Sequence, residues 1–595
     1  MRPTLQKYTQ LTGALLLGLA LVASVHGHGH GDDTSREMDM GQPSISRPTL
    51  SLDTVAPEAT AGPQSYFQYG EYSGWIVAHI VLMTIGWVFV LPIGVMLSLA
   101  QSHYSLPMQF VFLAINAVGV LLATIYNAST PDLYPNNAHH KLGWILTWVI
   151  SAHVLMGLVS AYAGRREDLK HEERGSFIQI STAAMEEHQR LHGQETFRYS
   201  NDSGQGTEPD TERLRSHSTS STRSDQHQLC DVHLEREDEY SEKEGLIPSS
   251  RIDRFFSRKI PGLLSARALR VMQLAYGFID RVILIMGFIG IATGIVTYGG
   301  LFMGAQIFSG LAHWIKGGVF FWYGILTLGR WAGSFADIGW AWNINLSRGS
   351  RRPTAEFVES LLIFIYGSTN IFLEHLAAWG NEWSAQDLEH ISITVMFIGG
   401  GACGMLVESK RIRDLLNTTS PPPNSHLSNL TNKELELLEP KSYRFSMNPI
   451  PALIILLLGL MMSSHHQHSM FSSMIHQQWG ILLVGAAFAR AATYIISYIS
   501  PPTSVLPGRP PTELITAFCL MAGGLIFMVS SHDTVTSLES YDLDAMFVFT
   551  VSMGVITLLM AWIILVIAIK GWALKIKGRS ATNSTFVGYR RVETA

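Results

Sequence analysis

The chain has little cysteine and little charge. Only three of its 595 residues are cysteines, Cys230, Cys403 and Cys519, and this scattered set provides neither a disulfide framework nor a Cys-x-x-Cys metal pair. Charged residues make up 15% of the chain and the net charge is −5, so there is no electrostatic footprint for nucleic acid. Flavin, nicotinamide and Walker motifs and a Ser/His/Asp constellation are also missing. Any redox activity would therefore need an external electron donor.

Apolar residues, by contrast, are abundant and gathered into long runs, and the mean hydropathy is +0.19. These runs predict an all-α, polytopic membrane helix bundle of about eleven spans that contacts the lipid bilayer. The predicted spans are Gly74–Ala100, Met108–Tyr126, Leu142–Ala163, Leu274–Gly299, Ile307–Leu328, Phe357–Trp379, Ile391–Val407, Ile450–Met462, Gly480–Tyr498, Ile515–Ser530 and Phe547–Trp572.

The N-terminus has the pattern of a cleavable signal peptide over residues 1–27. Arg2 and Lys7 precede the apolar segment Leu11–Val25, which is too short to be a span. Cleavage after Ala23 and cleavage after Gly27 both fit the small residues that follow. The mature chain then begins in the lumen or outside the cell, which predicts a multi-pass protein of the secretory-pathway, vacuolar or plasma membrane.

The basic residues agree with this orientation. With a lumenal start, the segments that follow the odd-numbered spans face the cytosol, and the positive-inside rule places basic residues there. Those segments contain Arg165, Arg166, Arg330, Arg348, Arg351, Arg352, Lys410, Arg411, Arg413, Arg509, Lys575, Lys577 and Arg579. The lumenal loops after the second, sixth, eighth and tenth spans hold almost no Lys or Arg.

A long charged insert divides the chain. A lumenal tail (28–72) precedes a three-span unit (73–164), and an eight-span unit (266–574) is followed by a cytosolic tail (575–595). Between the two units, residues 165–265 are charged and rich in Ser and Thr, as in Ser216–Asp225. This segment has too few apolar residues to form a core, so we expect it to be disordered in the cytosol.

Three histidines of the three-span unit suggest a haem site. His79 and His139 lie near the lumenal ends of the first and third spans, which run parallel, so that two imidazoles at matching depth could hold a haem iron axially. His153 lies fourteen residues after His139, on the same helix face and about 21 Å along the axis. This spacing is typical of a helix that carries one ligand for each of two haems. The alternative is that these histidines only hydrogen-bond between helices.

The same residues carry a family resemblance over roughly Gly74–Gly164. His79–Met83, with Gly86-Trp87 and Pro92–Gly94 after it, resembles the first conserved helix of ascorbate-type transmembrane cytochromes b. His139–Gly143 is similar to the HxxLG helix start of that family. The matching positions further along are Gln109 and Gly157.

That resemblance implies that His79 and His139 are axial ligands of a haem b. The family's second ligand pair has no histidine counterpart near Ser105 or within Tyr276–Arg281, so it implies one haem. As a whole, the arrangement of signal peptide, three-span unit, cytosolic insert and second multi-span unit resembles the fungal family called yeast putative transmembrane proteins. That family supplies no mechanism.

Histidine and methionine, 23 of each, form dense tracts on the predicted lumenal side. One tract bridges the eighth and ninth spans and contains His465, His466, His468 and His476 among Met461, Met462, Met470 and Met474. The imidazole donors suit Cu(II) or Zn(II), and the thioethers favour Cu(I). A solvated loop without a bound metal explains the composition equally well.

A second candidate metal site lies near the lumenal ends of three spans. His375 ends the sixth span, Asp387 and His390 open the seventh, and His313 is near the start of the fifth. Three imidazoles and a carboxylate form a donor set of the zinc or iron type. Capping and interfacial hydrogen bonding are the alternative.

Three functions fit these patterns. The first is a single-haem, cytochrome-b-like oxidoreductase with a redox role at the lumenal face. The second is a copper or zinc transporter or sensor that uses the His/Met tract for capture. The third is a structural membrane protein that retains the helices without a cofactor.

Overall fold

The computed structural model describes residues 65–176, 266–344, 352–374, 383, 385–418, 445–465, 467 and 469–593. Within these ranges the regular structure is entirely helical. The main helices are α2 (Ser73–Thr84), α3 (Leu91–Leu99), α4 (Ser105–Ser129), α5 (Ala138–Ser176), α8 (Ala266–Gly299), α9 (Ile307–Ala332), α10 (Ala355–Glu374), α11 (Ala385–Glu408), α12 (Lys410–Asn417), α14 (Ile450–Ser463), α15 (Met470–Ile499), α16 (Pro511–Val529), α17 (His532–Ser540) and α18 (Ala545–Glu593).

Every predicted span overlaps a helix within the described residues, which confirms the all-α membrane architecture. Eight helical segments are long and apolar enough to cross a bilayer, and the first of them joins α2 to α3 through the π-helical stretch η1 (Ile85–Val90). Three of the eight lie within residues 73–161. Of the remaining predicted spans, α14 is apolar but only 14 residues long. The other two are α9 and α10, which include polar residues among their apolar ones.

Several boundaries differ from the sequence-based ones because helix continues beyond the apolar run. α5 runs to Ser176, into the charged segment that was predicted to be disordered. α15 begins at Met470, so part of the His/Met tract is helical and not loop. Charged and polar residues such as Glu, Lys and Arg are good helix formers, so hydropathy alone marks the ends of spans and not of helices. The signal peptide, the lumenal tail and residues 177–265 of the insert lie outside the described residues.

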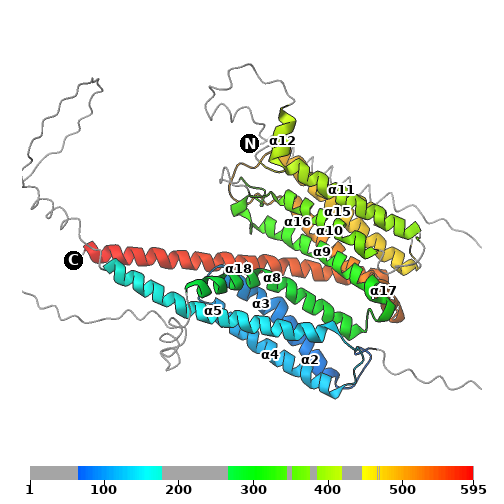
Figure 1. Ribbon diagram of the computed structural model, residues 1–595, viewed down its shortest axis with the longest axis horizontal. Helices are drawn as coiled ribbons and strands as arrows, with labels where there is room; N and C mark the ends of the chain where they lie inside the picture. Colours follow the sequence, from blue (N-terminus) through cyan, green and yellow to red (C-terminus); the bar gives the residue numbers. More distant parts are fainter. Residues whose placement is uncertain are drawn as a thin grey trace, which may run out of the picture. The chain divides into compact units, whose positions relative to one another are not determined.

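The chain divides into two compact units. One comprises Met1–Ser151 with Asp280–Ala595, and the other comprises Ala152–Ile279. In the first unit, α18 is the long red helix in Figure 1 and contacts α3 as well as α9, α15 and α16. Its Trp562 donates a hydrogen bond of 2.9 Å to the carbonyl of Val88 in η1. This contact joins the last span to the first.

Residues 266–574, for which eight spans were predicted, are called the eight-span region below. Its helices contact each other through small residues. Gly317 of α9 and Gly524 of α16 are so close that a Cβ on Gly524 would lie 2.6 Å from the Gly317 carbonyl. Gly459 of α14 and Gly480 of α15 meet in the same way, at 2.7 Å. Small residues allow this close approach of helix backbones inside membranes. The buried aromatic contact nearby is Trp479 stacked on Phe527, with ring centres 4.2 Å apart.

Candidate functional site

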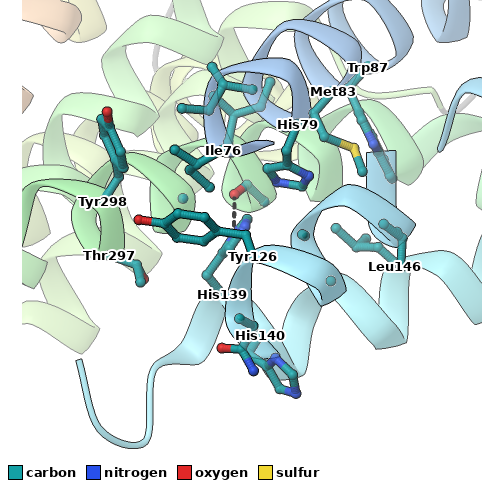
Figure 2. A pocket seen from close by; sticks show the side chains of 18 of the residues that line it. Ile76, His79, Met83, Trp87, Tyr126, His139, His140, Leu146, Thr297 and Tyr298 are labelled. Atoms are coloured by element: carbon teal, nitrogen blue, oxygen red, sulfur yellow. Dashed lines mark hydrogen bonds between the residues drawn. The ribbon is translucent and has the colours of Figure 1, made fainter. Parts of the chain in front are cut away.

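A cavity of about 460 Å³ lies between the helices of the three-span region and α8, the first helix of the eight-span region. It is bounded by α2, η1, α4, the first turns of α5 and the C-terminal half of α8. Most of the lining is apolar, and the polar side chains that reach it include two of the predicted haem ligands, His79 and His139 (Figure 2). Its volume falls in the range of about 300–1,000 Å³ that is usual for ligand and cofactor sites.

His79 and His139 form a pair within this cavity. Their ring centres are 6.3 Å apart and their planes are inclined at 74°. His79 comes from α2 and is buried, with 8% of its surface exposed. His139 comes from the first turn of α5 (Figure 2). The structure therefore brings together the two histidines that the sequence placed at matching depth.

Backbone carbonyls fix the tautomer of both rings. Nδ1 of His79 donates to the carbonyl of Gly119 at 2.8 Å, and Nδ1 of His139 donates to the carbonyl of Gly290 at 3.1 Å. A carbonyl oxygen only accepts, so each Nδ1 carries the proton, and in the neutral imidazole Nε2 keeps its lone pair. This arrangement, in which one nitrogen is anchored and the other presents a lone pair, is the usual state of a metal-ligating histidine.

Glycines give the His139 ring its space. A Cβ on Gly294 of α8 would lie 3.1 Å from Cε1 of His139, closer than ordinary van der Waals contact. Gly290, one turn earlier, supplies the carbonyl that binds Nδ1. The sequence analysis missed both residues, because glycines are common in membrane helices and nothing local marks these two as neighbours of His139.

A chain of polar side chains crosses the helices beside the cavity. Trp87 donates from Nε1 to Oδ1 of Asn116 at 3.2 Å, and Nδ2 of Asn116 donates to Oγ1 of Thr147 at 3.3 Å. Trp87 lies in η1, and short π-helical stretches frequently occur at functional sites. Asn116 is 2% exposed. An amide side chain inside an apolar run is the feature of the sequence that could have identified Asn116, and it was not recognised as a signal.

The segments outside the spans are bonded to one another beside the cavity. The backbone N–H of Leu133 donates to the Tyr66 hydroxyl at 3.2 Å, and the Tyr134 hydroxyl donates to the carbonyl of Leu301 at 2.7 Å. Burial raises the pKa of Tyr66, and burial together with the charge of Asp533 raises the pKa of Tyr134. Both hydroxyls therefore keep their protons at neutral pH, and these hydrogen bonds between the segments outside the spans are maintained.

His153, the third predicted haem ligand, lies in the other compact unit. It is 3% exposed and stacks on Tyr276, with ring centres 4.2 Å apart and planes 7° from parallel. The aromatic partner stands within the Tyr276–Arg281 segment, where the resemblance would call for a ligand of a second haem. A role of His153 in haem binding stays a prediction.

The His/Met tract is not a single loop, because its second half belongs to helix α15. His476 is buried in α15 and its Nδ1 donates to the Ser472 carbonyl at 2.8 Å. Its ring centre is 6.3 Å from that of His313 in α9, which the sequence analysis assigned to the other candidate metal site. His465 has its Nδ1 4.0 Å from Glu389 Oε2. His466 and His468 lie outside the described residues.

The remaining candidate metal ligands stay predictions. Asp387 and His390 are both on α11, as predicted, and His375 lies outside the described residues. Within the described ranges, no three His, Cys, Asp or Glu side chains converge as a metal site would require.

Comparisons with known proteins agree with the two-part organisation. The family described as "Protein YTP1-like, C-terminal" matches residues 286–571, and a domain of unknown function, DUF2427, matches residues 61–163. No solved structure matches the chain.

The relatives are fungal membrane proteins. An uncharacterised membrane protein of Schizosaccharomyces pombe is 34% identical over 507 residues, which are 84% of this chain and 94% of the relative. An uncharacterised membrane protein of Saccharomyces cerevisiae is 39% identical over 351 residues, 56% of this chain and 53% of the relative. Protein YTP1 of the same yeast is 24% identical over 224 residues, 38% of each chain. The extent of the first match shows that the chain belongs to the YTP1-like family of fungal multi-pass membrane proteins.

Proposed function

We propose that the cavity beside α2, α4, α5 and α8 binds one haem b, with His79 and His139 as its axial ligands. The chain would then be a membrane cytochrome with a redox role on the lumenal side. The observation that carries this proposal is the geometry of the two rings. Each is held by a carbonyl at Nδ1 and presents Nε2 within one cavity.

The separation of the rings supports an axial pair. A metal–nitrogen distance of about 2.0 Å and a ring radius of about 1.1 Å on each side place the centres of two axial imidazoles about 6.2 Å apart. The observed separation is 6.3 Å. The separation of the two rings is therefore compatible with both holding one metal ion.

The lining also suits a large apolar cofactor. Ile76, Ile80, Met83 and Leu146 contribute apolar surface, and the indole of Trp87 adds an aromatic wall. The side-chain hydroxyls of Tyr126 and Tyr298 are polar groups of the kind that orient a ligand at the edge of a site. When bound, a haem would supply one-electron chemistry, and its potential would be tuned by the carbonyls behind the histidines and by burial.

Interhelical hydrogen bonding alone is the competing explanation for the two histidines. It accounts for the bonds to Gly119 and Gly290. It does not explain why both rings line a cavity of about 460 Å³ whose walls are mainly apolar. We therefore favour the cofactor.

The electron donor would be external, because the sequence contains no flavin or nicotinamide motif. In the orientation that the basic residues predict, the site lies near the lumenal ends of α2 and α5, and its electron donor or acceptor would be on that side.

Haem content in purified variants tests the assignment. Protein from haem-replete cells should contain about one haem per chain, and His79→Ala and His139→Ala should each lose it because one axial donor is removed. His103→Ala is the matched control, since His103 is exposed and its ring contacts that of Tyr104 outside the cavity. Full haem content in both cavity variants, with protein levels equal to the control, would refute the ligand assignment.

A further inference from the structure

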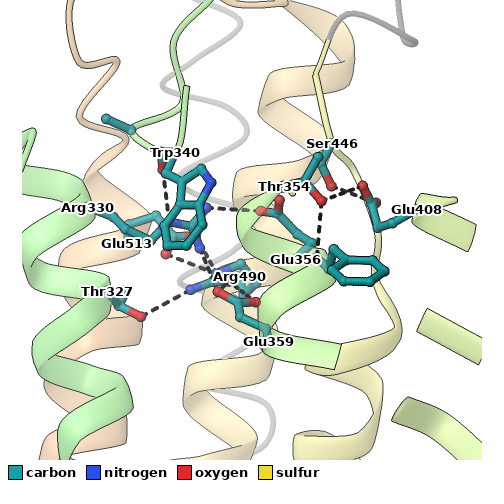
Figure 3. Close-up of polar contacts among 12 residues, drawn as sticks. Thr327, Arg330, Trp340, Thr354, Glu356, Glu359, Glu408, Ser446, Arg490 and Glu513 are labelled. Atoms are coloured by element: carbon teal, nitrogen blue, oxygen red, sulfur yellow. Dashed lines mark hydrogen bonds and ion pairs between the residues drawn. The ribbon is translucent and has the colours of Figure 1, made fainter. Parts of the chain in front are cut away.

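A second set of buried ionisable residues lies in the eight-span region, at the helix ends that are predicted to face the cytosol. The proposed haem cavity lies near helix ends that are predicted to be lumenal. Two arginines and three glutamates from four helices are in contact there (Figure 3). Their exposed fractions lie between 0% and 5%. The five, called the buried ion network below, are Arg330 of α9, Glu356 and Glu359 of α10, Arg490 of α15 and Glu513 of α16.

Glu359 is the bridge between the two arginines. Its Oε1 accepts from Arg330 at 2.6 Å, and its Oε2 accepts from Arg490 at 3.3 Å. Arg330 also donates to Glu356 at 3.0 Å. Both arginines thus contact Glu359. Each also contacts a second carboxylate, which is Glu356 for Arg330 and Glu513 for Arg490.

The charges of the buried ion network do not balance. Three carboxylates face two guanidinium groups, which leaves one negative charge in excess if all five residues are ionised. An uncompensated charge away from water is strongly unfavourable, and proteins avoid it by neutralising the group or binding a counter-charge. Among the described residues, no further Lys, Arg or His contacts the network. The ion pairs of the described residues thus leave one carboxylate charge uncompensated.

Within the described ranges, Glu513 contacts a single arginine, Arg490, and the hydroxyl of Thr493. Both of its oxygens face the same Nε of Arg490, Oε1 at 2.8 Å and Oε2 at 3.0 Å. One N–H cannot be directed at two oxygens, and Oε1 receives no hydrogen bond within the described part of the chain. Glu513 has no exposed surface. A proton on Glu513 would remove the excess charge and would leave the second oxygen to accept from Arg490.

We propose that the buried ion network is a proton-binding site, in which Glu513 takes up one proton from water as a carboxylic acid and releases it as a carboxylate. The site would make the eight-span region responsive to pH on the side that the basic residues assign to the cytosol. Protonated carboxyls and ion pairs inside membrane domains commonly mark proton pathways.

Other titratable groups surround Glu513 and would be coupled to it. The hydroxyl of Tyr494 is buried, lies within electrostatic range of Glu356 and Glu359, and has no hydrogen-bond partner among the described residues. This hydroxyl would be available to form a hydrogen bond when the charge of the buried ion network changes. The charged groups that act on Glu513 directly are Arg490 on α15, Arg330 on α9 and Glu359 on α10. A second layer interacts with those residues and with Glu356, and consists of Tyr323 on α9, Tyr494 on α15 and Glu408 on α11.

A tryptophan-containing loop covers the network. Arg330 donates from Nε to the carbonyl of Trp340 at 2.8 Å, and its guanidinium lies 4.4 Å from the ring centre of Trp342. Asn343 ties this loop to the carbonyl of Val505 at 2.7 Å. A change of charge in the network would therefore act on the indole of Trp342, which lies against both arginines and whose fluorescence provides an internal reporter.

Infrared difference spectroscopy of the full-length protein in lipid nanodiscs tests the proposal. Buried glutamates can hold a proton up to about pH 8–9, so titration between about pH 5 and pH 10 should show a carboxylic-acid band that disappears as pH rises. The Glu513→Gln variant should lack that band. Glu539→Gln, which changes an exposed glutamate of α17, is the control and should keep it. A band that persists in Glu513→Gln would overturn the assignment to Glu513.

Stability and proton counting separate a proton site from a purely structural ion network. Gln replaces a protonated Glu with nearly the same shape and charge, so at neutral pH the melting temperature of Glu513→Gln should equal that of wild type. The variant should release about one proton fewer per chain in an alkaline jump. A large fall in melting temperature, with unchanged proton release, would show that Glu513 is ionised and serves only as a partner of Arg490. If proton release disappears when sodium is added at constant ionic strength, a metal cation and not a proton fills the site, and the proposal fails.

Discussion

At the residue scale, the orientation of His139 depends on the α8 residues that surround it. The Gly290 carbonyl binds Nδ1, and Gly294 leaves room for the ring. The sequence predicted the pair of histidines from their depth in parallel helices, but it could not predict these two partners. They lie about 150 residues further along the chain, and only the packing of α5 against α8 brings them to His139.

Enlarging Gly294 should therefore weaken cofactor binding without unfolding the protein. In Gly294→Val the new side chain would meet His139 Cε1, where a Cβ alone would already lie at 3.1 Å. We expect haem affinity to fall about tenfold, equivalent to about 1.4 kcal/mol, as measured by haem titration of the apoprotein. Gly74→Val is the control, because a Cβ at Gly74 has nothing within 4 Å. Equal affinities in the two variants would show that the His139 ring does not need this space.

At the scale of helices, hydropathy predicted where the spans lie because each apolar run is a local property. It did not predict that α5 and α18 extend beyond their spans, since propensity and not hydropathy decides where a helix ends. The buried ion network was also missed. Arg330 was counted as a cytosolic loop residue, but its contact with Glu359 joins α9 to α10 and depends on tertiary structure.

The contact between α9 and α16 leaves no room for an added side chain. A Cβ on Gly524 would collide with the backbone nitrogen of Phe321 and would lie 2.6 Å from the Gly317 carbonyl. Overpacking of this kind typically costs about 1–3 kcal/mol, so Gly524→Val should lower the melting temperature in detergent. Gly554→Val, on α18 with nothing within 4 Å of its Cβ, should leave it unchanged. Equal melting temperatures would mean that the two helices separate easily.

At the scale of the whole molecule, the basic residues define an orientation that the helix positions alone do not. With this orientation, the candidate haem pair is lumenal and the buried ion network is on the cytosolic side. The two proposed sites would then face opposite compartments. Hydropathy did not predict how the helices of the eight-span region pack, including the glycine contacts of α9 with α16 and of α14 with α15.

A glycosylation reporter tests this orientation. An acceptor site inserted near Ser218, in the charged segment, should remain unmodified because that segment is predicted to be cytosolic. The same site inserted at Asn136, between α4 and α5, should be modified because this loop is predicted to be lumenal. The reverse result would place the candidate haem pair on the cytosolic side.

The most direct test of the central claim is the absorption spectrum of the full-length protein purified from haem-replete cells. Two imidazole ligands at His79 and His139 predict a low-spin b-type spectrum, with a Soret band that shifts on reduction. The band should be absent from the double variant His79→Ala/His139→Ala purified in parallel. A correctly folded wild-type protein without a Soret band, or an unaltered band in the double variant, would contradict the proposal that this cavity binds haem.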